Sequence, residues 1–196
     1  TVSISIMGVL SKRGIAPCDI SYLAHGTTVA TNALIQKKGG KTGLITTKGF
    51  RDLLEIGRQT RPSLYELDKA AVPPISPGKY RCEVSGRLLY DGSEYQALDE
   101  EEVREKVQFL KKEGITAIAV CTLFSFVNPE HEQRIEEILK EDFPGAYVSV
   151  SNRVVPEFRE FSRMSTTVVN AFLGPVMEQY VTNFQDSIQA LGIQAS

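Results

Sequence analysis

The stretch ITAIAVCTLFSF, residues 115–126, decides the fold, because it is almost wholly apolar and rich in β-branched side chains. Such a continuous run is typical of a central strand in a parallel sheet that helices cover on both faces. Asp99 and the three glutamates after it predict a helix that ends at Gly114. Asn128-Pro129 predicts the start of another helix directly after the strand. The centre of the chain therefore predicts an α/β fold.

Other short apolar runs predict the remaining strands. Three of them are expected to be buried in the sheet, at 20–24, 42–46 and 147–150. The runs 80–84 and 86–90 alternate well enough for an antiparallel hairpin joined near Ser85. Together these patterns predict an α/β fold whose mixed, partly parallel sheet is flanked by helices and carries an inserted hairpin.

Apolar residues at helical spacing predict further helices. We expect them at 28–36 and 49–56, and a first helix that closes at Gly14. From Glu157 a long helical stretch reaches residue 192, and Gly174-Pro175 is expected to interrupt it. The proline-rich and charged residues 58–77 predict an ordered loop, long enough to suggest a function.

Composition excludes several classes of protein. A chain of 196 residues suits one large domain or two small ones, and its 22 basic and 24 acidic residues give a formal charge of −2. This balance gives no reason to expect nucleic acid or an anionic membrane as a partner. The first 14 residues lack the basic start of a signal peptide, and their apolar part is too short to span a membrane.

The three cysteines, Cys18, Cys82 and Cys121, are odd in number and far apart. Neither a CxxC pair nor a Cys/His spacing accompanies them, so neither a disulfide framework nor a zinc site is predicted. We expect all three to be small buried residues in a reducing compartment, which predicts a cytoplasmic protein. The chain begins at Thr1, which suggests that it has been processed or cut from something longer.

The stretch LAHGTTVATNAL, residues 23–34, carries more polar groups than a strand-to-helix turn needs. Its glycine would let a ligand approach the backbone, and the hydroxyls of Thr27 and Thr28 could donate to phosphate oxygens beside the free N–H groups of the helix start. Thr31 and Asn32 follow Thr28 by three and four residues, so these side chains can share a helix face. The alternative is ordinary N-capping by Thr27 or Thr28, and spacing leaves both readings open.

The two histidines allow no metal site. His25, next to Gly26, could orient a carbonyl or a phosphate, but a histidine at a strand end is also commonly a hydrogen-bonded structural residue. His131 lies between Glu130 and Glu132 in the first turn of a charged helix, which predicts a solvated surface position. No metal-binding triad can be assembled from histidines placed in this way.

Two further polar clusters are candidates for a site. Guanidinium groups suit carboxylates and phosphates, and Arg51, Arg58 and Arg61 surround the loop LLEIGRQTRPSLY, although arginines are also common in solvated loops. The second cluster, PEFREFSRMSTTVVN, precedes an apolar helix and suggests either a lined cleft or elaborate capping in which Ser165 is the cap. Its polar residues are Glu157, Arg159, Arg163, Ser165, Thr166, Thr167 and Asn170.

Common nucleotide and hydrolase motifs do not occur. The sequence contains neither GxxxxGK[ST] nor GxGxxG nor GxSxG, and no pair of catalytic carboxylates can be identified from spacing. The residues by themselves therefore predict an α/β domain with a candidate phosphate-binding turn.

Three longer stretches resemble signature regions of the hydantoinase A/5-oxoprolinase family. They are HGTTVATNALIQKKGGKTGLITTKGFRDLLEIGRQTRPSLYEL, AVCTLFSFVNPEHE and VVPEFREFSRMSTTVVNAFLGPVM, and they cover nearly the whole chain in the family's order. The resemblance implies part of a lobe of the actin-like, acetate and sugar kinase and Hsp70 type, which is ribonuclease H-like. Members include ATP-dependent 5-oxoprolinases, N-methylhydantoinases and subunits of acetone and acetophenone carboxylases.

This resemblance implies that ATP phosphorylates an amide or ketone oxygen, so that protein groups must hold phosphates and stabilise negative charge. By motif, the expected catalytic residues are His25, Thr27, Thr28, Glu157 and Arg159. The expected substrate- or phosphate-binding residues are Gly26, Thr31, Asn32, Arg58, Arg61, Arg163, Ser165 and Thr166. The resemblance also implies ATP and Mg²⁺ for the full-length enzyme, a small cyclic amide as substrate, a hydantoinase B-type partner subunit, and a homo-oligomer as a further option.

The chain also departs from the family's pattern. No glycine-rich DxGGTFTD loop precedes Thr1, and the second lobe expected after Gly192 does not follow, so we expect an N-terminal fragment that binds no nucleotide alone. Within this incomplete lobe, 1–192, we expect a part with the HGTT turn at 1–78 and a hairpin at 79–92. An α/β part at 99–151 and a long helical segment at 156–192 follow, and a truncated tail is expected at 193–196. The alternatives are a ketone carboxylase subunit and a non-catalytic ligand-binding or subunit-docking module.

Overall fold

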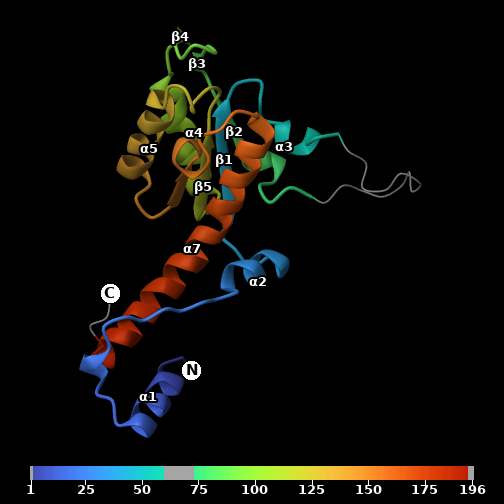
Figure 1. The fold of residues 1–196 in the computed structure, drawn as a ribbon. Helices are drawn as coiled ribbons and strands as arrows, with labels where there is room; N and C mark the ends of the chain where they lie inside the picture. Colours follow the sequence, from blue (N-terminus) through green and yellow to red (C-terminus); the bar gives the residue numbers. More distant parts are fainter. Residues whose placement is uncertain (1, 60–72, 194–196) are drawn as a thin grey trace. The chain divides into compact units, whose positions relative to one another are not determined.

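The computed structural model describes residues 2–59 and 73–193 (Figure 1). The chain divides into two compact units. The central unit comprises residues 39–175, and the terminal unit comprises residues 1–38 together with 176–196. Arg61 and most of the predicted loop at 58–77 lie outside the described residues.

The central unit is built on a four-stranded parallel sheet in the order β2-β1-β5-β6. All three strand pairs are parallel, and the two inner strands are aligned so that Thr46 lies opposite Cys121. The predicted α/β fold with a sheet flanked by helices is confirmed, and the central strand lies within the stretch that predicted it. A mixed, partly parallel sheet was expected, whereas all the described strand pairs of this sheet are parallel. The strands are β1 (Thr42–Thr47), β2 (Arg81–Val84), β5 (Ala117–Cys121) and β6 (Tyr147–Val150).

Helices cover both faces of this sheet (Figure 1). On one face, Ile45 and Ile118 pack with apolar side chains of α4 (Glu100–Lys112) and α5 (Glu130–Asp142). On the other face, Leu44 packs with residues of α7 (Glu160–Ala190). Neighbours in a strand point to opposite faces, so an uninterrupted apolar run is needed to fill two layers. The smaller helical elements are α3 (Leu53–Ile56), η2 (Gly78–Tyr80) and α6 (Ser151–Val154).

The predicted caps at the starts of α4 and α5 are largely confirmed. The Asp99 carboxylate accepts the N–H of Glu102 over 3.0 Å, which satisfies one of the free donors at the start of α4. The Asn128 carbonyl oxygen accepts the N–H of Glu130 over 3.0 Å, so it satisfies a donor at the start of α5. Pro129 occupies the N-cap position, one residue earlier than expected.

The predicted position of the hairpin is wrong. The first of its two runs is β2, which joins the parallel sheet, and the second run contributes β3 (Arg87–Leu88) to a separate antiparallel pair with β4 (Glu94–Gln96). Gly86 has a φ of 142°, a left-handed conformation that separates the two runs. Asp91 accepts the N–H of Ser93 at 3.0 Å, so the residues after the second run form the turn.

Helix α7 continues through Pro175, so the predicted interruption at Gly174-Pro175 is wrong. A proline displaces the carbonyls of the preceding turn, and the Phe172 carbonyl there accepts the N–H of Gly40 over 2.8 Å. Gly174 lies against the ring of Tyr147, where a Cβ atom would come within 2.1 Å of Cε1. The helix begins at Glu160 rather than near Glu157, so Ser165 lies inside it and is not a cap.

The terminal unit contains α1 (Val2–Arg13), the 3-10 turn η1 (Pro17–Asp19), α2 (Val29–Ile35) and the second half of α7. Gly14, with a φ of 67°, follows the first helix as predicted. The prediction of a strand at 20–24 is wrong, because this segment is irregular and mostly exposed. Among the described residues no strand pairs with it, and an isolated extended segment has no ladder to satisfy its backbone.

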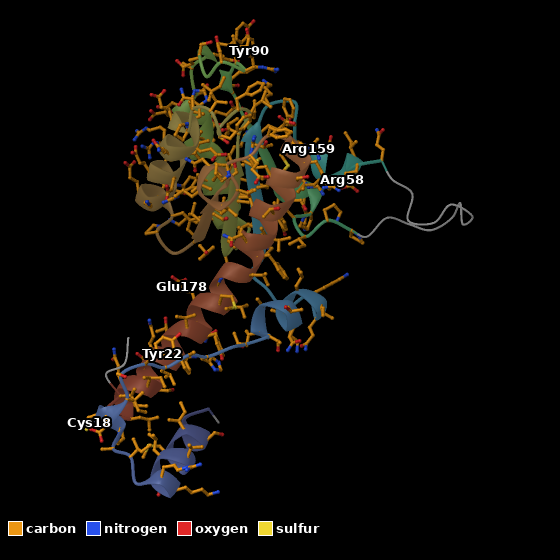
Figure 2. All side chains as sticks on the ribbon, in the orientation of Figure 1. Cys18, Tyr22, Arg58, Tyr90, Arg159 and Glu178 are labelled. Carbon is orange, nitrogen blue, oxygen red and sulfur yellow. The ribbon has the colours of Figure 1, made fainter. Side chains whose placement is uncertain are left out.

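The cysteines divide into two environments. Cys82 and Cys121 are buried as predicted, and burial raises the pKa of each thiol to about 11. Cys18 is exposed, so the expectation that it is buried is wrong (Figure 2). It lies in the short 3-10 turn η1, in which no residue is buried.

Candidate functional site

The HGTT turn satisfies part of its hydrogen bonding locally. The Thr27 hydroxyl accepts the N–H of Val29 over 3.2 Å, and the Asn32 amide donates to the Thr28 hydroxyl over 3.2 Å. Thr28 is the N-cap residue of α2 but makes no side-chain capping bond. Thr27 therefore forms a local turn bond just before α2, but it is not the N-cap residue. The residues from Gly26 to Thr28, with Thr31 and Asn32, are exposed, so their remaining donors face solvent.

His25 is held by the second half of α7, which belongs to the same unit. Its Nε2 atom lies 2.5 Å from the Tyr180 hydroxyl, and its ring stacks on Phe184 with 4.7 Å between centroids. Both contacts fix the orientation of the imidazole. They fit the structural interpretation of this histidine, while its catalytic role stays a prediction.

The second polar cluster lies in the central unit around the first turn of α7. Arg163 is buried, with 1% of its surface exposed. Its guanidinium donates to the Thr122 carbonyl over 2.7 Å and to the Glu157 carbonyl over 3.1 Å. The guanidinium carbon also lies 5.2 Å from the ring centre of Phe126. Arg163 thereby joins the end of β5 to the residues before α7.

The other members of this cluster, and Arg58 of the loop cluster, have different surroundings. Arg58 donates to the Ser162 hydroxyl over 3.0 Å, so the structure does bring it to the start of α7. Arg159 is exposed and has a φ of 75°, and Figure 2 labels both arginines in the central unit. Thr166 donates to the Ser162 carbonyl over 2.8 Å, an ordinary bond within a helix. Ser165 lines a separate recess whose other walls are apolar.

The carboxyl ends of β1 and β5 form the topological switch point of the sheet. The chain leaves β1 for β2 on one side and returns to β5 on the other, and in open α/β sheets ligands bind in the crevice at such a point. Thr46 donates to the Cys121 carbonyl over 2.8 Å, and the Thr47 hydroxyl accepts the N–H of Leu123 over 3.0 Å. These bonds fix the two strand ends against each other.

A small recess at this point is lined by residues of β1, β5, α3 and α7 and of the segment after β5, among them Thr46, Thr122 and Arg163. Two buried polar atoms of these residues, Thr122 Oγ1 and Arg163 Nε, have no hydrogen-bond partner among the described residues. An unpaired buried donor is uncommon, and the nitrogens of arginine can only donate. Because both atoms can donate, the residues fit an anionic oxygen better than a cation.

A buried carboxylate holds the loops that follow β5 and β6. Glu132 has no exposed surface and accepts the N–H of Thr122 at 2.8 Å, the hydroxyl of Ser151 at 2.6 Å and the N–H of Asn152 at 2.8 Å. Burial raises its pKa, because the desolvation of the charged form outweighs these bonds. The signal in the sequence that could have identified Glu132 is its spacing of three residues from Ile135, which places it on the apolar face of α5.

His131 is buried, so its predicted position on the solvated surface is wrong. It is 5% exposed, and its Nε2 atom lies 2.7 Å from the Glu94 carboxylate of β4. The neighbouring glutamates suggested an exposed turn, but the antiparallel pair β3-β4 supplies a partner that the sequence did not reveal. The histidine therefore joins α5 to that pair.

In residues 2–59 and 73–193, no group of three or more His, Cys, Asp or Glu side chains could hold a metal ion. Within the same ranges, no helix is long and apolar enough to cross a membrane.

Comparison with known proteins gives matches over most of the chain. The family described as "Hydantoinase/oxoprolinase N-terminal region" matches residues 2–143. Caprolactamase subunit alpha of Pseudomonas jessenii is 38% identical over 183 residues, which are 92% of this chain and 26% of that protein. Acetophenone carboxylase gamma subunit of Aromatoleum aromaticum is 33% identical over 186 residues, which are 88% of this chain and 25% of that protein.

The solved structure of the ATP-dependent caprolactamase from Pseudomonas jessenii has the same fold. It superimposes with a TM-score of 0.85 at 34% identity and covers 98% of this chain and 28% of that one. The chain thus spans about a quarter of the length of these relatives.

Proposed function

The chain belongs to the hydantoinase/oxoprolinase family, in its N-terminal region, and from this premise we propose that it is part of an ATP-dependent enzyme that hydrolyses a cyclic amide. The family comprises subunits of ATP-dependent amide hydrolases and carboxylases. The observation that carries the proposal is the similarity to the caprolactamase, which extends over 98% of the chain in structure. The activity would belong to the whole protein rather than to this part.

The central unit would contribute donors for negative charge. Phosphoryl transfer to an amide oxygen requires groups that hold phosphate oxygens and stabilise developing charge. Arg163 Nε and Thr122 Oγ1 are buried and lack partners among the described residues, and both residues line the recess at the switch point. The recess is small, so it would receive one oxygen of a substrate or phosphate rather than a whole nucleotide. Arg58, Arg159 and Glu157 would act from the adjacent start of α7.

The terminal unit would contribute the exposed hydroxyls of its HGTT turn. Thr28 makes no capping bond to the backbone of α2, and the Thr31 side chain faces solvent, so both can donate to a ligand. His25 would orient the turn through its contacts with Tyr180 and Phe184. Gly26, Thr27 and Asn32 complete the proposed set, and Arg61, Ser165 and Thr166 are retained from the family motif alone.

ATP would enter as a substrate of the complete enzyme. Mg²⁺ would be held mainly through its phosphates, because the described residues provide no cluster of metal ligands. We further propose a hydantoinase B-type partner subunit, a cytoplasmic location, and a chain that binds no nucleotide alone. Two of the relatives are themselves named as subunits, which supports the proposal of a partner.

The test uses the protein that contains this chain, assayed for ATP hydrolysis that a lactam such as caprolactam or 5-oxoproline stimulates. Thr27→Ala/Thr28→Ala and Arg163→Lys are expected to lower the stimulated rate by roughly tenfold or more, as the loss of one charge-stabilising donor does. Ser187→Ala, which removes an ordinary bond inside α7, is the matched control. Unchanged turnover in both variants would remove these residues from the site, and calorimetric binding of ATP by the isolated chain would contradict its proposed dependence on the rest of the enzyme.

A ketone carboxylase subunit is the second candidate. It is favoured by the 33% identity to the acetophenone carboxylase gamma subunit. Bicarbonate-dependent ATP hydrolysis with acetophenone or acetone, and none with lactams, would select it. If neither substrate class stimulates ATP hydrolysis, a non-catalytic docking module becomes the better proposal.

A further inference from the structure

A groove of about 480 Å³ lies beside β2, which is an edge strand of the sheet. Its walls come from the segment after β1, from β2 itself and from α4. Every lining residue belongs to the central unit. The groove is separate from the recess at the switch point, and nothing in the proposed function uses it.

The backbone of β2 presents unpaired groups to this groove. The Val84 carbonyl accepts the N–H of Lys48 over 3.1 Å, so Val84 directs its backbone groups toward β1. Alternate residues of a strand point their backbone groups to opposite sides, so Glu83 directs its N–H and C=O outward. In the part of the chain that the structure describes, neither group has a hydrogen-bond partner. β2 is thus an open edge strand at Glu83.

On both sides of Glu83, backbone groups at this edge of β2 already have hydrogen-bond partners. Before it, the N–H of Arg81 donates to the Gly78 carbonyl. After it, the N–H of Ser85 donates to the Glu102 carboxylate over 2.7 Å, and the Ser85 carbonyl accepts the N–H of Asp99 over 3.0 Å. A ligand that completes the edge must therefore offer both an acceptor and a donor opposite Glu83.

The side chains around this edge are predominantly cationic. Five basic and three acidic residues line the groove, and two of the basic residues already have carboxylate partners, Arg81 in Glu55 over 2.8 Å and Arg51 in Asp52 over 3.5 Å. Two of the carboxylates already accept backbone N–H groups, Glu83 from Gly49 over 2.6 Å and Glu102 from Ser85. Lys48 and Lys106 have no ion-pair partner within the described ranges. The groove is therefore complementary to a negatively charged ligand.

We propose that this groove binds an extended segment of a partner polypeptide with acidic side chains, which adds to the sheet as a strand beside β2. A peptide backbone supplies both the acceptor and the donor that Glu83 requires, whereas a phosphate or carboxylate would leave its carbonyl unpaired. Alternate side chains of the added strand would face the cations, and Phe109, 41% exposed, would contact their apolar parts. A second copy of this chain is disfavoured, because pairing two such edges would bring the same cations together.

The test measures binding of fluorescent peptides to the chain by anisotropy. The probe is a peptide of about eight residues, the length of one long strand, in which glutamate alternates with valine. Its counterpart has lysine in place of every glutamate. We expect the acidic peptide to bind and the basic one not to, with an affinity that falls as salt is added.

Changes in the peptide backbone test the addition of a strand, and changes in the lysines of the groove test the attraction of charge. Methylation of alternate backbone nitrogens on the peptide edge that faces β2 should abolish binding, while methylation of the other edge should not. Lys48→Glu/Lys106→Glu should weaken binding of the acidic peptide by roughly tenfold or more, whereas Lys112→Glu, on the same helix but outside the groove, should not. Circular dichroism checks that the variants remain folded, and the methylated peptides need no change in the protein.

Several outcomes would overturn the proposal. Equal binding of the methylated and unmethylated peptides would show that no strand is added. Tighter binding of tripolyphosphate than of the peptide, with competition between them, would assign the groove to a small polyanion. Dimerisation of the chain that the Lys48→Glu/Lys106→Glu variant removes would assign the edge to a second copy.

Discussion

The Glu132 carboxylate accepts the hydroxyl of Ser151 over 2.6 Å, and this bond joins the first turn of α5 to the end of β6. Through the N–H of Thr122, the same carboxylate also holds the end of β5. A single buried side chain thus fixes two adjacent loops at the carboxyl edge of the sheet. The Thr122 carbonyl on one of these loops accepts the Arg163 guanidinium.

Replacing this carboxylate should destabilise the central unit. In Glu132→Gln the side-chain amide brings an N–H₂ group among three donors, so at least one of them loses its acceptor. We expect a loss of about 1–3 kcal/mol in the free energy of unfolding, the cost of a buried unsatisfied polar group. Urea denaturation measures it. Glu137→Gln, an exposed position on the same helix, should change stability little, and an equal loss in both variants would contradict the role of burial.

The same residue predicts a pH dependence. Burial raises the pKa of Glu132, so the folded protein binds more protons at this site than the unfolded chain does, and its stability contribution falls as pH rises above the normal carboxyl pKa. The stability of the wild type relative to Glu132→Gln should therefore grow as pH falls toward the normal carboxyl pKa. In a comparison of the two proteins, the pH-dependent stability contributions of carboxylates whose pKa is lowered, such as Asp91 and Glu100, cancel. A difference that shrinks with falling pH would show that the bonds outweigh desolvation.

Two helical glycines should respond to alanine in opposite directions. A Cβ at Gly174 would lie 2.1 Å from Cε1 of Tyr147, so Gly174→Ala forces the ring or the helix to move and should cost about 1–3 kcal/mol. Gly8 in α1 has nothing within 4 Å of the added atom, so Gly8→Ala should stabilise the protein by about 0.5–1 kcal/mol. Thermal unfolding compares them. A neutral Gly174→Ala would mean that Tyr147 has an alternative rotamer.

The three thiols should differ in reactivity. At pH 8 a thiol whose pKa is about 11 is ionised in only about one molecule in a thousand, and Cys82 and Cys121 are also shielded from reagent. Titration with a chromogenic disulfide should therefore detect one fast thiol, Cys18, and the other two only after unfolding. Cys18→Ser should abolish the fast phase, and a fast thiol that remains in that variant would show that the sheet opens.

The strands that the sequence predicted correctly are those filled from both faces. Residues 117–121 and 42–47 carry apolar or small side chains at every position, so their signal does not depend on distant partners. The errors occur where a distant partner decides the structure. Residues 20–24 are apolar but lack a neighbouring strand, whereas residues 81–84 alternate like a hairpin strand yet pair with β1.

The candidate site could be predicted only in part for the same reason. Arg163 was identified from its cluster, but its bond to Thr122, 41 residues away, is a product of the fold. Glu132 was missed because the glutamates around it suggested an exposed face. Its spacing from Ile135 was the one local signal, and only the loops at the ends of β5 and β6 turn that burial into a hydrogen-bonded network.

The strand order also has a consequence for the time course of synthesis. Thr46 and its partner Cys121 are 75 residues apart, so one side of β1 has no neighbour until the second half of the central unit has been made. At translation rates of about 5–20 residues per second, this interval lasts roughly 4–15 seconds. During that interval a nascent chain exposes an apolar edge to other chains, and such long-range parallel pairing is intrinsically slow. The step most exposed to chaperones and to aggregation is therefore the docking of β5 onto β1.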